Sequence, residues 1–327
     1  MKSALRLLPL LAFAAAAPAA DLRIAMLGLD TSHTVSFAKI FNDPANPQHV
    51  PGARIVTGWK GGSPDVPDSA GRVEGFAATL AGTYGVRICG TIEEAVRGAD
   101  AIMIENVDGR PHLAEARQVL PLRKPVFIDK PMAGSLRDGI EIFRLARKYG
   151  TPCFSASDER FSGDITGLKQ ARIGRMLGVF CYGPCELEPH VPDLFWYGVH
   201  AVEKCYALTG PGCRTVVRTS TPDADVVTGV WSDGRTVTVR GNRHSRHTYG
   251  TILFGTDAIV EGVPAPGYRP MLLEMMRFFR SGVAPVSSRE TVETLAFMEA
   301  ADASKRAGGV PVTLEAVIRA SGGEDGI

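Results

Sequence analysis

The chain has 327 residues, of which 45% are hydrophobic and 22% charged, and its formal net charge is +1. This length exceeds what one ordinary hydrophobic core holds and predicts two domains. The near-neutral charge, without a basic block, argues against nucleic acid and against an anionic membrane surface as partners.

The first twenty residues differ from the rest. Lys2 and Arg6 form a basic start, residues 7–19 are apolar, and Ala17-Pro18-Ala19 supplies small side chains at a cleavage position. This order is typical of a secretory signal peptide, and the apolar stretch is too short to span a bilayer comfortably. We therefore expect residues 1–20 to be removed, which leaves an exported, periplasmic or extracellular protein without a membrane span. An uncleaved membrane anchor is the alternative.

Six cysteines permit disulfides in an exported chain, and the pairs nearest in sequence are Cys181 with Cys185 and Cys205 with Cys213. In a domain of this size they could equally be buried thiols. Together with two histidines they do not match the spacing of a compact zinc module, so the sequence predicts no metal site.

In the first half of the chain, short apolar runs alternate with helical patterns. The runs predicted to be strands are 22–28, 54–59, 86–89, 100–104, 126–128 and 154–156. Helices are expected after Thr31 or Ser32 and over 73–84, 92–97, 112–119 and 135–149, whereas 60–71 is expected to be a long loop. This alternation predicts a doubly wound parallel sheet, a Rossmann domain over residues 21–155.

From about residue 163 the pattern changes to long alternating segments. Strands are predicted over 215–219, 226–231, 236–240, 247–254 and 258–261, and helices over 165–171, around His200, over 270–280 and over 288–306. Alternation of apolar and polar residues is typical of antiparallel strands with one buried face. Residues 156–327 are therefore predicted to form a C-terminal α/β domain on a large, mostly antiparallel sheet.

Two short motifs carry the chemistry. Asp129-Lys130-Pro131 ends an apolar strand, and Gly198-Val199-His200 begins a helix in the second domain. A lysine at a strand end and a histidine on the following domain are what a sugar dehydrogenase needs, because one polarises a hydroxyl and the other takes its proton.

The order of these motifs resembles the Gfo/Idh/MocA family, which includes glucose–fructose oxidoreductase and inositol dehydrogenase. The residues that carry the resemblance are Asp129-Lys130-Pro131, Gly198-Val199-His200, Asn106 with His112, Arg160 in Asp158-Glu159-Arg160-Phe161, the segment 249–257, and the C-terminal segment 298–312. The resemblance covers nearly the whole chain after residue 20.

The resemblance implies an NAD or NADP cofactor and a small sugar-like substrate. It makes Lys130 and His200 the catalytic residues, with His200 as the general base. The implied cofactor-binding positions are Gly28, Asp30, Ser32, His33, Asn106, Asp129 and Lys130, and the implied substrate-binding positions are Arg160, Trp196, Tyr197 and Asp193. Family members assemble through the free face of the second sheet, so we expect a homo-oligomer with Trp231 and Val237 as candidate contacts.

The sequence departs from the dinucleotide fingerprint of the family. The G-x-G-x-x-G pattern falls on residues 28–33, where Gly28 is retained but Asp30 and His33 replace the second and third glycines. A carboxylate at the second position is expected to repel the pyrophosphate, and His33 to obstruct helix–strand packing. Either these two residues face a different ligand, or Asp30 caps the strand end and His33 packs in the first helical turn.

The family's aspartate, four residues before the histidine, is replaced by Trp196. Asp193 lies two helical turns from His200, and Glu203 is near enough to orient it. Trp196 and Tyr197 could form a stacking platform for a sugar ring or be core aromatics.

No acidic residue follows the second strand, where Lys60 and Ser63 suit a 2′-phosphate better than a bare ribose. The sequence therefore predicts an exported oxidoreductase that acts on a sugar or polyol with NAD(P). The alternatives are an NAD-dependent glycoside-cleaving or isomerising enzyme and a non-catalytic carbohydrate-binding protein that kept the fold.

Overall fold

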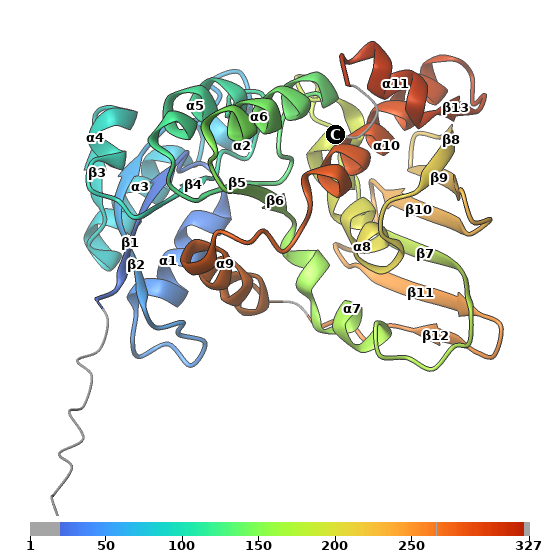
Figure 1. The fold of residues 1–327 in the computed structure, drawn as a ribbon, viewed down its shortest axis with the longest axis horizontal. Helices are drawn as coiled ribbons and strands as arrows, with labels where there is room; N and C mark the ends of the chain where they lie inside the picture. The colour runs from blue at the N-terminus through green and yellow to red at the C-terminus, as the bar shows by residue number, and fades with distance from the viewer. Residues whose placement is uncertain (1–19, 266, 324–327) are drawn as a thin grey trace, which may run out of the picture.

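A computed structural model describes residues 20–265 and 267–323 of the chain. All but Ala20 of the predicted signal peptide lies outside the described residues. The chain folds around two sheets that lie side by side, a parallel sheet built from the first half and a mixed sheet built from the second (Figure 1).

The first sheet has the strand order β3-β2-β1-β4-β5-β6. Its strands are β1 (Leu22–Leu27), β2 (Ala53–Trp59), β3 (Arg87–Cys89), β4 (Ala101–Ile104), β5 (Val126–Asp129) and β6 (Cys153–Ala156), and all neighbouring pairs are parallel. This order reverses between β1 and β4, which is the switch point at which doubly wound sheets bind ligands. The predicted Rossmann domain is confirmed as a fold.

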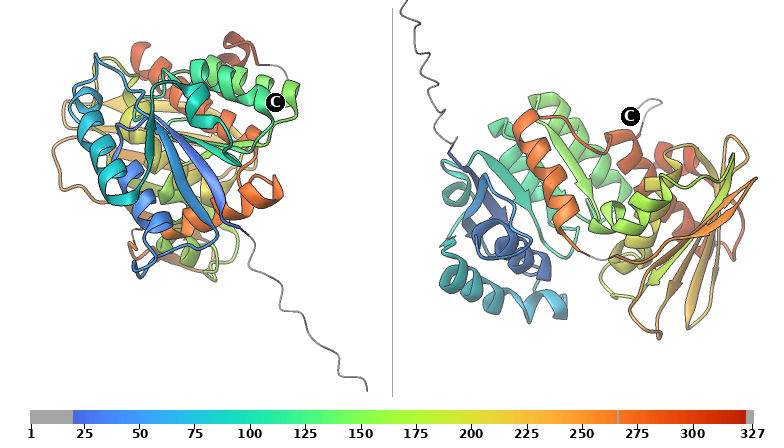
Figure 2. Two further views of the ribbon diagram at one scale, coloured as in Figure 1. Left: turned by 90° about the vertical axis from the view of Figure 1, so that its left-hand side faces the viewer. Right: turned by 90° about the horizontal axis from the view of Figure 1, so that it is seen from below.

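Helices cover both faces of this sheet (Figure 2). One face carries α4 (Ile92–Val96), α5 (His112–Val119) and α6 (Leu136–Tyr149), and the other carries α1 (Ser32–Asn42) and α3 (Val73–Tyr84). A short helix, α2 (Pro67–Ala70), interrupts the segment that was expected to be a loop, and a 3₁₀ turn, η1 (Leu120–Leu122), follows α5. Both ends of α6 obey capping rules, since the Ser135 side chain accepts from the Asp138 amide and Gly150 adopts a left-handed φ of 65°.

The second sheet has the order β12-β11-β7-β10-β9-β8-β13. Its strands are β7 (Met176–Pro184), β8 (Cys213–Ser220), β9 (Ala224–Trp231), β10 (Thr236–Asn242), β11 (Gly250–Gly255), β12 (Ile259–Glu261) and β13 (Val312–Thr313). Only the β7–β10 pair is parallel, so the prediction of a mostly antiparallel sheet is confirmed. The sequence patterns did not predict β7, which lies third from one edge of the sheet.

Three helices of the second half of the chain lie beside the second sheet. α8 (Val199–Thr209) and α10 (Ser288–Arg306) pack on the inner face of the sheet, and α11 (Leu314–Ala320) follows β13. η2 (Asp158–Phe161) and α7 (Gly163–Leu168) connect the two sheets. None of the described helices is long and apolar enough to cross a membrane.

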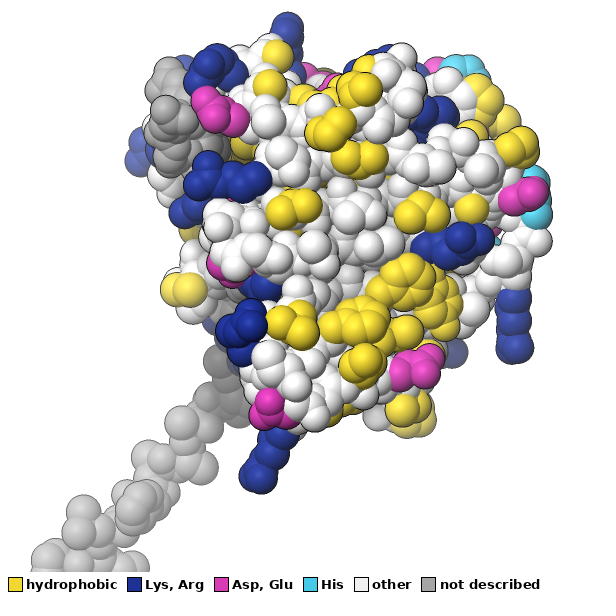
Figure 3. Space-filling view, turned by 90° about the vertical axis from the view of Figure 1, so that its right-hand side faces the viewer, with side chains coloured by type: hydrophobic (Ala, Val, Ile, Leu, Met, Phe, Trp, Pro, Cys, Tyr) yellow, Lys and Arg dark blue, Asp and Glu magenta, His cyan; other side chains and the backbone are white. Residues whose placement is uncertain are grey.

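No helix of the described residues covers the outer face of the second sheet, which shows apolar side chains (Figure 3). Trp231 and Val237, the expected oligomer contacts, point to the inner face, where they are 2% and 0% exposed. That expectation is wrong because strand alternation places both in the core. The outward positions hold half-buried or exposed residues, among them Phe180, Tyr182, Val226, Val230, Ile252 and Phe254.

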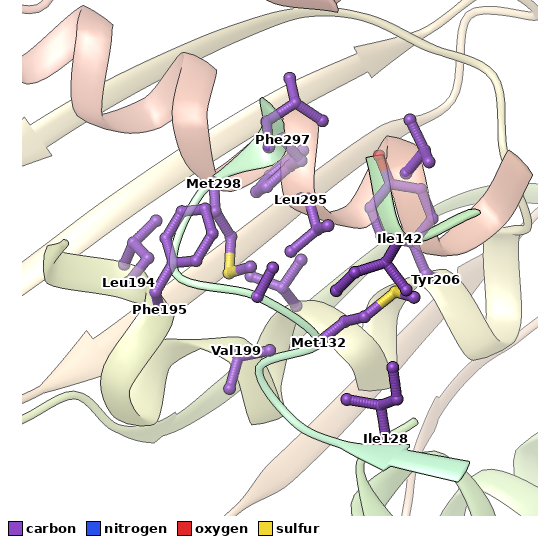
Figure 4. Packing of buried hydrophobic residues seen from close by; sticks show 14 of the residues in the cluster. Ile128, Met132, Ile142, Leu194, Phe195, Val199, Tyr206, Leu295, Phe297 and Met298 are labelled. Atoms are coloured by element: carbon purple, nitrogen blue, oxygen red, sulfur yellow. The ribbon is translucent and has the colours of Figure 1, made fainter. Parts of the chain in front are cut away.

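The two halves of the chain share one continuous core (Figure 4). Ile128 of β5 and Met132, which lies shortly after this strand, belong to the same buried cluster as Phe195 and as Phe297 of α10. Helix α9 (Arg269–Ser281) returns to the first sheet, where Phe278 meets Phe154 edge to face at 4.6 Å between ring centroids. The six cysteines are free thiols, and five of them are buried.

Candidate functional site

A cavity of about 370 Å³ lies between the two sheets, with walls from both halves of the chain. Its lining includes Thr31, Ser32, His33, Arg72, Val107, Lys130, Asp158, Glu159, Trp196, Tyr197, His200, Tyr249, Gly267 and Tyr268. The fold thus brings Lys130 and His200 to one cleft. A larger hollow of about 850 Å³ lies among β8, α10 and α11, but none of the residues predicted for the site lines it.

Lys130 reaches this cleft from the carboxyl end of β5. The residue is 7% exposed, and its ammonium group makes no hydrogen bond or ion pair with any other residue in the described ranges. A lysine held at a cavity wall without a protein partner has its charge and donors available for a ligand.

His200 stands in the first turn of α8, directly after a π-helical turn, η3 (Leu194–Gly198). Gly198 permits this turn, because a Cβ there would lie 2.9 Å from Leu194 Cδ2 and 3.2 Å from Cys185 Sγ. The ring is 6% exposed, and its Nδ1 lies 2.7 Å from Ser157 Oγ. Ser157 therefore holds the ring, and Glu203, the residue expected to orient it, does not.

The pKa of His200 lies well below its usual value because burial disfavours the imidazolium, and the positive charge of Lys130 adds to this effect. His200 is consequently neutral at physiological pH. When Nδ1 donates its proton to Ser157 Oγ, the other ring nitrogen keeps a free lone pair, which is the form a general base requires.

Aromatic side chains form the second-domain wall of the cleft. Trp196 and Tyr197 lie edge to face at 6.0 Å, and Tyr249 meets the His200 ring in the same way at 5.6 Å. Trp196 is 6% exposed, so most of its ring packs in the core and only an edge borders the cavity. Tyr249 and Tyr268 were not predicted as site residues. No sequence signal marked Tyr268, because it lies in an irregular segment before α9.

Two of the predicted substrate residues do not line the cleft. Arg160 is 5% exposed, its Nε lies 3.2 Å from Glu203 Oε2, and it also pairs with Glu290. Asp193 accepts from Arg218 Nη2 at 2.8 Å and from Lys305 Nζ at 2.5 Å. Both side chains form ion pairs with residues that are distant in sequence. Their positions therefore do not support the predicted contact with a substrate.

The first βα turn contains Gly28, which has a φ of 80°. A Cβ at this position would lie 2.4 Å from Asn106 Cγ, so only glycine fits. Gly61, in the loop after β2, is packed against the same turn, and a Cβ on Gly61 would lie 3.0 Å from Gly28 Cα. The turn that should approach a pyrophosphate is thus covered by Asn106 and by the loop after β2.

Asp30, at the second glycine position, points into the protein instead of into the cleft. Its carboxylate accepts from Ser69 Oγ at 2.6 Å and from the Val107 amide at 3.0 Å, and it is fully buried. Burial raises the pKa of Asp30, and the Ser69 hydrogen bond opposes that effect. The expected repulsion of a pyrophosphate is therefore replaced by a structural role, because Asp30 ties α2 and the segment after β4 to the first βα turn.

The loop after β2, residues 60–66, is fixed across the switch point by side chains. The Gly62 amide donates to Asn106 Oδ1 at 2.9 Å, and Ser63 Oγ donates to Asp108 Oδ2 at 2.6 Å. Lys60, which suited a 2′-phosphate, is ion-paired with Glu74 on the surface. These contacts lie across the crevice at the switch point over which a dinucleotide binds in Rossmann folds, on the side of β2.

Asn106 and His112 are likewise engaged within the protein. Asn106 Nδ2 donates to both carboxylate oxygens of Glu115, at 2.8 and 2.7 Å. The ring nitrogens of His112 lie 3.2 Å and 3.1 Å from the carbonyl oxygens of Met132 and Asn106.

His33 packs in the first helical turn, as the second interpretation has it, and borders the cleft. Its ring stacks on Phe37 at 5.2 Å within the first turn of α1, and it also lines the cleft. His33 Nδ1 lies 2.8 Å from Asp129 Oδ2, so the strand end of β5 and the start of α1 are joined beneath the cavity. Ser32, beside it, is exposed to the cleft at the positive end of the helix dipole.

The described residues therefore fit NAD(P) in part. Lys130, Ser32 and His200, which lie around one cavity, would hold the nicotinamide end of such a molecule, whereas the loop 60–66 lies where its adenosine end would bind. Accommodation of a whole dinucleotide requires this loop to move.

No protein-family model matches the chain, and no curated protein matches it in sequence. Solved structures do match in fold. GenD2 from gentamicin A biosynthesis, solved in complex with NAD, has a TM-score of 0.73 at 15% identity and covers 93% of this chain and 99% of its own. Myo-inositol dehydrogenase from Lactobacillus casei, in complex with NAD(H) and myo-inositol, has a TM-score of 0.71 at 13% identity, over 90% of this chain and 96% of its own.

Myo-inositol 2-dehydrogenase from Lactobacillus plantarum gives a TM-score of 0.72 at 15% identity, over 90% of this chain and 99% of its own. These neighbours have the two-domain fold of the Gfo/Idh/MocA dehydrogenases. The resemblance predicted from the motifs is thus confirmed at the level of the fold.

Proposed function

We propose that this protein is a Gfo/Idh/MocA-type oxidoreductase that oxidises or reduces a sugar or polyol with NAD(P). The observation that carries the proposal is the convergence of an unpartnered Lys130 and a neutral, buried His200 on one cavity. The solved neighbours support it, since GenD2 binds NAD and the Lactobacillus casei enzyme binds NAD(H) and myo-inositol. A cavity of about 370 Å³ suits a ligand the size of a monosaccharide.

In this mechanism Lys130 donates a hydrogen bond to the reacting hydroxyl and stabilises the negative charge that develops on its oxygen. His200 takes the hydroxyl proton on the ring nitrogen that does not face Ser157. Ser157 accepts from the other ring nitrogen and steadies the imidazolium that forms. NAD(P), when bound, supplies the acceptor for the hydride that leaves the same carbon.

The test is reduction of NAD⁺ or NADP⁺ by a panel of polyols and aldoses, followed by the absorbance of the reduced nicotinamide. Lys130→Met and His200→Asn should each lower kcat by about 100-fold or more, because positioned acid–base groups contribute on that scale. His190→Asn is the matched control, since that histidine pairs with Glu188 on the surface and should leave the rate unchanged. Full activity in both site variants would contradict the proposed roles.

A second candidate is a carbohydrate-binding protein that kept the fold without the chemistry. The loop 60–66, fixed across the switch point by Asn106 and Asp108, favours it. Calorimetric titration separates the two: binding of sugar without binding of NAD⁺ or NADP⁺ supports the second candidate, and binding of a dinucleotide supports the first.

We also propose that the protein is exported. The support is the basic start, the apolar stretch 7–19 and the small residues of Ala17-Pro18-Ala19. N-terminal mass analysis of the secreted protein should show a chain that begins near Ala20 or Asp21. An intact Met1 would contradict this.

A homo-oligomer through the outer face of the second sheet is the last part of the proposal. Phe180 and Tyr182 of β7 lie on that face with ring centroids 6.2 Å apart, beside Ile252 of β11, which pairs with Phe180. Apolar sheet faces of this kind are usually covered by a partner. Light scattering should give a multiple of the chain mass that Phe180→Glu reduces, and a monomer at high concentration would refute it.

A further inference from the structure

Three ionisable side chains meet beneath the cleft. His33 lies in the first turn of α1, Glu105 directly follows β4, and Asp129 is the last residue of β5. Each offers one ligand atom, and these three atoms all lie within 4.8 Å of one another. The strand ends and the helix start that carry them lie at the carboxyl edge of the parallel sheet, at and next to its switch point.

Glu105 has no partner in this cluster. The residue is 0% exposed, and neither of its carboxylate oxygens has a hydrogen-bond partner among the described residues. The same holds for Asp129 Oδ1. Buried polar oxygens without a partner are rare in folded proteins, because each one loses its hydrogen bonds to water on folding and gains none in return, which costs free energy.

The charges of the cluster are also unbalanced. Two carboxylates lie together in the interior, and among the described side chains His33 is the one that hydrogen-bonds to either of them, through Asp129. Lys130 adds a positive charge through space, but no ion pair joins it to either carboxylate in the described part of the chain. A bound cation would neutralise the two carboxylates and satisfy the free oxygens at once.

We propose that His33, Glu105 and Asp129 form a binding site for one divalent transition-metal cation. One imidazole and two carboxylates are a donor set that suits Zn²⁺, Mn²⁺ or Fe²⁺. Three protein ligands leave at least one coordination position open, as metal sites that bind water or substrate require. Because His33 also lines the cavity, the cleft gives the ion a route from solvent to the site.

The geometry requires a small adjustment. His33 Nδ1 and Asp129 Oδ2 lie 2.8 Å apart, which is closer than two ligands of a tetrahedral ion whose bonds are about 2.0–2.2 Å long. The ring must give up its hydrogen bond and move away from the carboxylate by roughly half an ångström, on the scale of those bond lengths. The site is independent of the proposed function, since it requires neither a dinucleotide nor a sugar.

The experiment uses chelator-treated, full-length mature protein titrated with Co²⁺ and then with Zn²⁺. We expect one Co²⁺ per chain, a visible d–d absorption band from the bound ion, loss of the band when Zn²⁺ replaces it, and a higher Tm in the presence of either metal. Glu105→Gln should weaken Co²⁺ binding more than about tenfold, since even outer-shell changes cost that much. This variant removes a buried charge without changing shape, so it should fold.

Glu115→Gln is the matched control, because Glu115 is also buried but its oxygens accept from Asn106. It should bind Co²⁺ like the wild type. The proposal is overturned if no stoichiometric Co²⁺ binds, or if binding persists unchanged in Glu105→Gln. Absence of binding together with a more stable Glu105→Gln protein would mean that a proton, and not a metal, neutralises the cluster.

Discussion

Replacement of Ser69 by alanine tests whether hydrogen bonds hold the loop 60–66 over the switch point. Ser69 Oγ donates to Asp30 Oδ2 at 2.6 Å and accepts from the Ser63 amide at 2.7 Å, and Ser69 is 0% exposed. Ser69→Ala leaves one buried carboxylate oxygen and one buried N–H without these partners. At about 1–3 kcal/mol for each of the two unsatisfied groups, the variant should lose roughly 2–6 kcal/mol of the free energy of unfolding.

Urea denaturation followed by tryptophan fluorescence measures this loss, and hydrogen exchange should show faster exchange over residues 60–66. Thr79→Ala is the matched control: its hydroxyl donates to the Gly75 carbonyl on the exposed face of α3, so it should change stability by less than about 0.5 kcal/mol. If Ser69→Ala and Thr79→Ala prove equally stable, the network does not hold the loop and our account of the closed crevice fails.

Three further predictions concern titration and backbone geometry. Burial raises the pKa of Glu115 to about 8, so the stability from its protonated form is complete below pH 4.5 and is lost as pH rises through about 8. In denaturation experiments the fall in stability between pH 5 and 9 should therefore be smaller in Glu115→Gln than in the wild type, by roughly 4 kcal/mol. Gly28→Ala should lower the free energy of unfolding by at least about 2 kcal/mol, because Gly28 has a positive φ and a Cβ there would lie 2.4 Å from Asn106 Cγ. Gly82→Ala on α3, where a Cβ meets open space, should instead stabilise the protein by about 0.5–1 kcal/mol. Equal Tm values for the two variants would contradict this. Because burial holds the pKa of His200 well below its usual value, kcat/KM should stay level as pH falls through 6.5, and a midpoint near 6.5 would show that the base is another group.

The strand–helix alternation of the first half was enough to predict its fold, because each element carries its own periodicity and caps. The predicted bounds of α3 and α10 agree with the structure. Strand β7 was missed, since Gly178, Gly183 and Pro184 read as loop residues. The structure explains two of them: a Cβ on Gly178 would lie 2.3 Å from the Thr236 carbonyl oxygen, and one on Gly183 would lie 2.5 Å from the Tyr249 ring.

For the site, sequence reasoning placed Lys130 and His200 in one cleft because strand ends and the following domain meet there by topology. It could not place Arg160, whose ion-pair partner Glu290 lies 130 residues further along the chain. Nor could it foresee that Asp30 would turn inward, because its partner Ser69 belongs to a helix that the sequence did not reveal. The position of a charged side chain depends on partners that only tertiary packing brings close to it. No local sequence pattern identifies such partners.

The return of α9 to the first sheet has a consequence for how the chain folds. Met271, Met275 and Phe278 of this helix fill the face of the parallel sheet beside Phe154 and α1. The first 156 residues therefore hold all six strands of that sheet but lack one of its covering helices until residue 281 has been made. A fragment that ends after β6 exposes this apolar surface, so the parallel sheet gains its full stability late, after the chain has passed through the entire second sheet except β13.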